Sequence, residues 1–110
     1  MAYIDLNEMT RPEAVLADYD TRHGVTARRN MLVGLWAAEC LGLSGVEAED
    51  YAWSVHFADL QHPGVDDVVA KIAADFSTRG VAMKERSIRE QLRELERRAE
   101  LQIAAGLHRF

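Results

Sequence analysis

The chain has 110 residues, 48% of them hydrophobic, and a formal net charge of −5. This length fits one domain, and the acidic balance argues against generic nucleic-acid binding, which needs a concentrated basic surface. No apolar run approaches the roughly 20 residues that span a bilayer, and the N-terminus lacks the pattern of a secretory signal. Cys40 is the single cysteine, so no internal disulfide forms, and we expect a cytoplasmic protein.

The first 26 residues predict a segment that is flexible or only partly helical. Thr10–Glu13 fits a capping box with a proline in the first helical turn, which favours a short helix from about Pro12 to Thr21. Gly24 predicts a break after that helix. We therefore expect an N-terminal segment, residues 1–26, followed by a helical domain, residues 27–110.

Two helices are predicted in the first half of that domain. Ala27–Leu41 carries apolar residues at helical spacing, and Gly42 supplies a C-terminal stop. Ser44–Glu47 fits a second capping box, which opens a helix running to about Leu60. The sequence Pro63-Gly64 ends that helix.

Two further helices follow, each with one apolar face. The first begins near Val65, ends at Gly80, and has a regular apolar stripe: Val65, Val68, Val69, Ile72, Ala73 and Phe76. The last runs from about Lys84 to Ala105, with a stripe of Ile88, Leu92, Leu95, Ala99 and Ile103. No useful β-alternation occurs, so the predicted fold is all-α, a four-helix bundle with short connections.

A search for catalytic chemistry gives weak candidates only. His56, Asp59 and His62 have a spacing that suits an open metal site, although His62 precedes Pro63 and is expected beyond the helix end. Cys40 lies near a helix C-terminus, where the dipole disfavours a thiolate. Ordinary polar and structural roles are the favoured interpretation of these residues, with a metal-dependent enzyme as a distant alternative.

Acidic residues also fall short of an acid–base pair. A catalytic carboxylate pair must converge inside an apolar pocket, and the sequence does not predict such a pocket around Glu39, Glu47, Glu49 and Asp50. A solvated acidic face is therefore favoured. No glycine-rich phosphate loop is present. We therefore predict no catalytic residues and no metal site.

Binding to a larger partner is the better hypothesis. Arg28 and Arg29 open a predicted helix, where cations meet an unfavourable dipole, so they are either surface residues or contacts to an acidic or phosphorylated partner. Trp53 and Phe57 lie beside the apolar stripe of their helix and widen its apolar arc. They are candidates for a partner-facing patch.

The segment Ala27–Gly45 contains the runs RRN, GLWAAE and LGLSG, and it resembles the zeta subunit family of inhibitors of alphaproteobacterial F-type ATP synthases. The similarity continues through most of the chain to Ile103. The resemblance implies a non-enzymatic four-helix protein whose N-terminal segment enters an interface between α and β subunits and blocks rotation of γ. It also implies peripheral association with the inner-membrane synthase, no required cofactor, and weak binding of ADP or ATP.

The N-terminal segment departs from the family pattern, which is a continuous charged helix-former. Pro12, Tyr19, His23 and Gly24 stand in that region, and the comparable positions are Asp18, Asp20 and Arg22. The resemblance makes these three residues predicted partner contacts, in addition to Arg28, Arg29, Trp53 and Phe57, which the residue pattern alone suggests. The alternative is a diverged bundle that has lost inhibition and serves as a nucleotide-responsive or generic interaction module.

Overall fold

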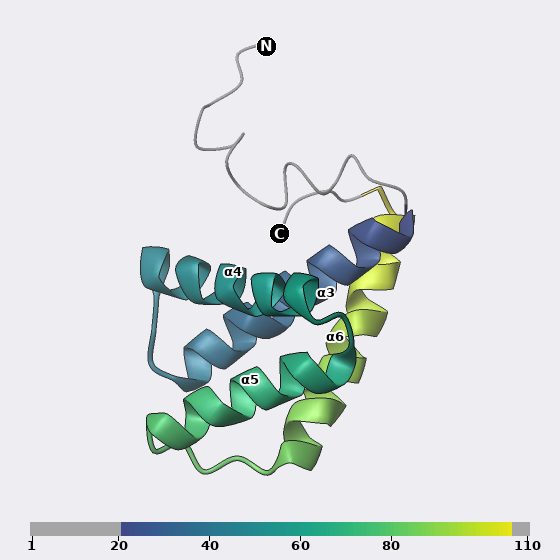
Figure 1. Cartoon of the computed structure of the whole chain (residues 1–110). Helices are drawn as coiled ribbons and strands as arrows, with labels where there is room; N and C mark the ends of the chain where they lie inside the picture. Colours follow the sequence, from purple (N-terminus) through teal and green to yellow (C-terminus); the bar gives the residue numbers. More distant parts are fainter. Residues whose placement is uncertain (1–20, 107–110) are drawn as a thin grey trace.

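A computed structural model describes residues 21–106, which form four helices and confirm the predicted all-α bundle. The helices are α3 (Thr21–Cys40), α4 (Gly45–Gln61), α5 (Val65–Thr78) and α6 (Glu85–Ala104). Helix α3 packs against both α4 and α6, and α5 packs against α4 and α6. Figure 1 shows the start of α3 beside the end of α6, so these two helices run antiparallel.

The core follows the periodicity of the sequence. Most residues of the α5 and α6 stripes are buried together with residues of α3 and α4, in a core of Val33, Ala37, Val55, Val68, Val69, Ile72, Phe76, Ile88, Leu92 and Leu95. Val65, at the start of the α5 stripe, is exposed. Trp36 packs edge-on against Phe76, with ring centroids 5.9 Å apart. Trp36 is therefore packed against the core, in a geometry that aromatic pairs prefer.

The predicted glycine stops are confirmed at the ends of α3 and α5. Gly42 has φ 81° and Gly80 has φ 75°, a conformation that favours glycine because a Cβ is strained there. After each glycine, a backbone N–H reaches back over the helix end, from Leu43 to Ala38 O and from Val81 to Phe76 O. These bonds satisfy carbonyls that the helix leaves without partners.

The break predicted at Gly24 is wrong. Helix α3 begins at Thr21 and passes through Gly24, so the helix is longer at its start than the predicted Ala27–Leu41. Gly24 is buried beside α6, where an added Cβ would lie 3.4 Å from Ile103 Cδ1. Packing against α6 therefore outweighs the poor helix propensity of glycine.

The division of the chain at residue 26 falls within α3 and is otherwise untested, so it stays a prediction. The candidate contacts Asp18 and Asp20, and the short helix expected before Thr21, lie outside the described residues. Arg22 belongs to α3, but its side chain is also outside them. Among residues 21–106, no helix combines the length and apolar character that crossing a membrane requires.

Helices α3 and α4 approach each other closely at Gly34. A Cβ on this residue would stand 2.5 Å from Ala52 Cα and 2.9 Å from Ala52 Cβ. Two small residues therefore set the distance between the helices, and no larger side chain fits at Gly34.

Serine 44 is the residue that precedes α4, as the second capping box predicts. Its backbone is extended, but its side chain makes no capping hydrogen bond. The position of the helix start is therefore confirmed, while the side-chain bond expected of a capping box is not formed.

Candidate functional site

Arg28 and Arg29 are buried, with 4% and 6% of their surfaces exposed. Arg28 Nη1 donates to Gln102 Oε1 at 3.0 Å, and Arg29 Nη1 donates to Glu96 Oε1 at 3.0 Å. Both acceptors lie on α6. The interpretation of these arginines as surface residues is therefore wrong, because both side chains are buried against α6. Their role as partner contacts stays a prediction.

Asn30 is the centre of a fully buried polar cluster between α3 and α4. Its Oδ1 accepts from Arg29 Nε at 3.2 Å and Nη2 at 2.9 Å. A guanidinium can only donate, so this contact fixes the orientation of the amide. Its Nδ2 then donates to His56 Nδ1 at 3.1 Å and to Asp59 Oδ2 at 2.9 Å, which uses both amide hydrogens.

Asp59 extends the cluster to the turn after α4. Its Oδ1 accepts from the backbone N–H of Gly64 at 3.1 Å, and its Oδ2 lies 3.6 Å from Arg29 Nη2. The carboxylate is thus held by α3 and by the α4–α5 turn together. The Arg-Arg-Asn motif therefore has a structural role, because it joins α3 to α4 and α6 through charge-assisted hydrogen bonds.

His56 is neutral in this cluster. Because Asn30 donates to Nδ1, the imidazole proton resides on Nε2, and that nitrogen is buried without a hydrogen-bond partner. Burial lowers the pKa of His56 from its ordinary value, and this outweighs the opposite effect of the nearby Asp59. The folded protein therefore disfavours protonation of this side chain.

The metal interpretation of His56, Asp59 and His62 gains no support from the geometry. His62 follows the last turn of α4 and is exposed, whereas the other two side chains are buried and bonded to Asn30. Within residues 21–106, no three histidine, cysteine or acidic side chains gather closely enough to hold a metal ion.

The cysteine and the acidic residues show no catalytic arrangement. Burial and the neighbouring Glu39 raise the pKa of Cys40, so the thiol form is favoured over the nucleophilic thiolate. Glu39, Glu47 and Asp50 are exposed. These observations agree with the predicted acidic surface.

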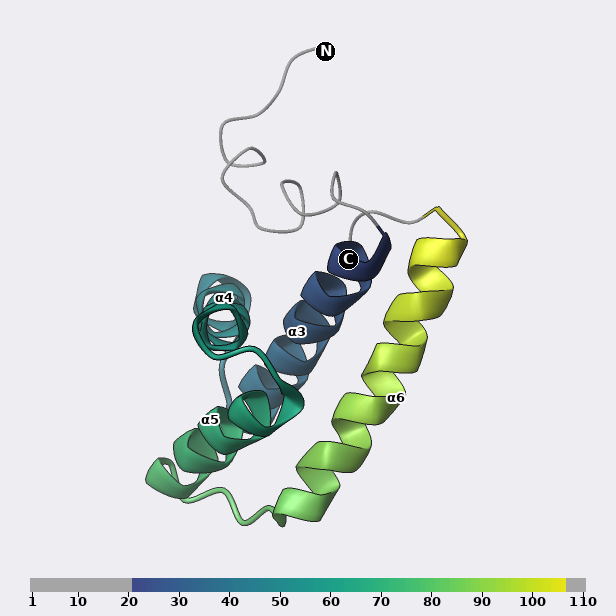
Figure 2. The same cartoon turned by 45° about the vertical axis from the view of Figure 1, so that its right-hand side comes forward.

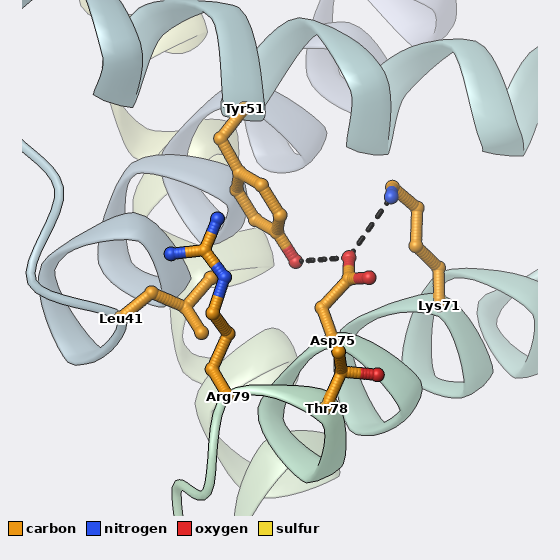
Figure 3. A pocket seen from close by; sticks show the side chains of 6 residues that line it. All are labelled: Leu41, Tyr51, Lys71, Asp75, Thr78 and Arg79. Carbon is orange, nitrogen blue, oxygen red and sulfur yellow. Dashed lines mark hydrogen bonds and ion pairs between the residues drawn. The ribbon is translucent and has the colours of Figure 1, made fainter.

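A small cavity of about 210 Å³ lies at the other end of α3, lined by Leu41, Tyr51, Lys71, Asp75, Thr78 and Arg79 (Figure 3). Tyr51 Oη donates to Asp75 Oδ2 at 2.8 Å, and Lys71 Nζ contacts the same oxygen at 2.9 Å. Burial and the bond to Asp75 raise the pKa of Tyr51. The cavity therefore offers a neutral phenol, a paired lysine and the exposed Arg79.

Trp53 and Phe57 occupy the outer side of α4. Phe57 is 51% exposed, Trp53 is partly buried, and the two rings stack with centroids 5.5 Å apart. The structure thus places both residues where a partner can reach them, and their role as contacts stays a prediction.

Comparison with known proteins identifies the relatives of this bundle. The sequence model of the ATPase inhibitor subunit zeta matches residues 1–102. The chain belongs to this family. The match begins at residue 1, so it includes the N-terminal segment in which the sequence departs from the expected pattern, and it confirms the resemblance carried by Ala27–Gly45.

A solved structure supports the same fold. A protein determined by solution NMR is 38% identical in sequence, with a TM-score of 0.67, over 76% of this chain and 95% of that chain. No curated protein matches the chain significantly. The zeta family consists of ATPase inhibitors, so an inhibitory role and association with an ATP synthase follow for this chain.

Proposed function

We propose that this chain is a non-catalytic regulatory subunit that binds the catalytic head of an F-type ATP synthase and limits ATP hydrolysis. The family match over residues 1–102 carries the proposal, because it covers both the N-terminal segment and the bundle. In this proposal the N-terminal segment inserts between α and β subunits and opposes rotation of γ. The protein acts in the cytoplasm, at the periphery of the inner membrane.

The anchoring of α3 supports this mechanism. Arg28 is bonded to Gln102, and Gly24 packs beside Ile103, so the first turns of α3 are fixed to the end of α6. A segment that opposes rotation needs a firm attachment, since a loose one gives way under load. Asp18, Asp20 and Arg22 precede this anchor in the sequence and are the proposed contacts with the head.

The test is ATP hydrolysis by the purified cognate head with added protein. We expect the full chain to inhibit hydrolysis and a chain lacking residues 1–20 to lose inhibition. This truncation keeps α3 whole, whereas removal of residues 1–26 also deletes the contact between Gly24 and Ile103. Equal inhibition by both chains would show that another part of the protein is the effector.

The cavity favours a second function, weak binding of ADP or ATP. Arg79 is exposed and Lys71 is partly buried, and both line the cavity, so both are suited to contact phosphate. The volume of about 210 Å³ is below the roughly 300–1,000 Å³ of typical ligand pockets, in keeping with weak binding. Titration of the amide resonances with ADP tests this function, and Arg79→Ala should weaken the response severalfold.

A further inference from the structure

The outer face of α4 carries an exposed apolar stripe, which we call the α4 stripe: Val46, Asp50, Trp53, Phe57 and Leu60. Val46, Phe57 and Leu60 are 72%, 51% and 57% exposed. The five positions are spaced by four, three, four and three residues, which is the spacing of a coiled-coil seam. One face of the helix therefore presents three large apolar side chains to solvent, with Asp50 and the partly buried Trp53 between Val46 and Phe57.

The fold does not use this face. The buried residues of α4 are Ala52, Val55, His56 and Asp59, which lie on the opposite side of the helix. Figure 2 shows α4 at the outside of the bundle, with α3 between it and α6. Exposed apolar surface of this extent is typical of a site that binds another protein.

The charges on α4 select the kind of partner. The helix has no lysine or arginine, and Glu47 and Asp50 are exposed at the end that carries Val46. Asp50 lies within the seam itself. An occupant that covers the stripe must therefore supply a basic side chain for Asp50 as well as apolar side chains for its neighbours.

Two occupants from the chain itself fail this requirement. A second copy of α4 brings another Asp50 into the seam and no base, so two buried carboxylates remain unpaired. Residues 1–20 contain five acidic residues and one basic residue, Arg11, so the acidic end of α4 repels them overall. The charge pattern therefore favours a different protein as the occupant.

We propose that the α4 stripe is the docking surface for a basic amphipathic helix on the outside of the ATP synthase head. This inference rests on the proposed function and adds a second contact to the one made by the N-terminal segment. The first turns of α3 lie beside the end of α6, and α4 lies on the other side of α3 (Figure 2). In this proposal both contacts form on the same head. Docking raises the effective concentration of the N-terminal segment at its interface.

The experiment compares full-length variants for binding to the purified head and for inhibition of ATP hydrolysis. We expect Phe57→Glu to weaken binding at least tenfold and to shift the inhibition curve to higher protein concentration by the same factor. Asp50→Arg should weaken binding about fivefold. The matched control is Leu101→Glu, since Leu101 is 66% exposed on α6 and lies outside the stripe. Thermal unfolding verifies that each variant is folded.

The outcomes separate the inference from the proposed function. If the wild-type chain does not bind the head, both are wrong. If it binds and Phe57→Glu binds equally well, only the docking inference is wrong. If sedimentation shows that the wild-type chain is a dimer and that Phe57→Glu is a monomer, the occupant is instead a second copy of the chain. If the amide resonances of α4 shift when residues 1–20 are removed, the occupant is the N-terminal segment. Either the dimer or this shift would overturn the docking inference.

Discussion

Helix α3 contains two glycines whose replacement by alanine should have opposite effects on stability. At Gly34, an added Cβ would stand 2.5 Å from Ala52 Cα, far inside van der Waals contact, and the obstacle is backbone. At Gly24, the nearest atom is Ile103 Cδ1 at 3.4 Å, an ordinary contact with the end of a side chain. The same chemical change therefore meets a clash at one site and a fitting space at the other.

The expected magnitudes follow from two effects. Alanine is favoured over glycine inside a helix by about 1 kcal/mol, and we expect about half of this at Gly24 because it lies in the first turn of α3. At Gly34, the helices must separate by about 1 Å, and overpacking of this kind typically costs about 1–3 kcal/mol. Separation also strains the buried hydrogen bonds of Asn30, so the expected net loss is about 2 kcal/mol.

Thermal and urea unfolding followed by circular dichroism measure both variants. For a domain of this size, Gly34→Ala should lower Tm by roughly 10 °C and Gly24→Ala should raise it by about 3 °C. A stabilised Gly34→Ala would mean that α3 and α4 are farther apart than the structure has them. A destabilised Gly24→Ala would refute the helical packing of that residue against α6.

Three further predictions concern the polar residues. Asp59→Ala leaves buried donors without an acceptor and should lower the free energy of unfolding, measured by urea titration, by about 3 kcal/mol. The control Glu90→Ala removes an exposed side chain and should change that free energy by less than about 0.5 kcal/mol. Burial lowers the pKa of His56 below its ordinary 6.5, so below that pH the unfolded chain binds more protons than the folded one. The free energy of unfolding should therefore decrease as the pH falls below about 6.5, and His56→Gln should reduce this dependence on pH. Tyr51→Phe removes the hydrogen bond to Asp75 and should cost about 1 kcal/mol, measured by urea unfolding at pH 7.

Periodicity predicted the last two helices well because each is amphipathic. Most of each predicted stripe is buried, although Val65 is exposed and Ala73 and Ile103 are only partly buried. The bounds Val65–Thr78 and Glu85–Ala104 lie within a residue or two of those predicted. Helix α4 also has the predicted bounds. Here the local sequence and the tertiary packing favour the same structure, so a pattern of apolar residues is sufficient.

The start of α3 was predicted wrongly because its stability is not local. Gly24 weakens a helix by its own propensity, but contact with Ile103 on α6 outweighs this effect. Arg28 and Arg29 find partners 74 and 67 residues away in the sequence. No local pattern identifies such pairs. The one available signal was the resemblance, which included Asn30, Asp59 and Gln102 but said nothing of their contacts.

The position of the buried polar cluster bears on both of the contacts that we propose. Burying Arg29 and Asp59 has a desolvation cost, and apolar side chains would fill the same space without it. Unlike apolar packing, directional hydrogen bonds fix how α3 sits against α4 and α6. That geometry determines how the start of α3 and the outer face of α4, which carries Phe57, are placed relative to each other. Asp59→Ala should therefore impair inhibition even under conditions in which the variant stays folded, and Tyr51→Phe, which lies outside this cluster, should not.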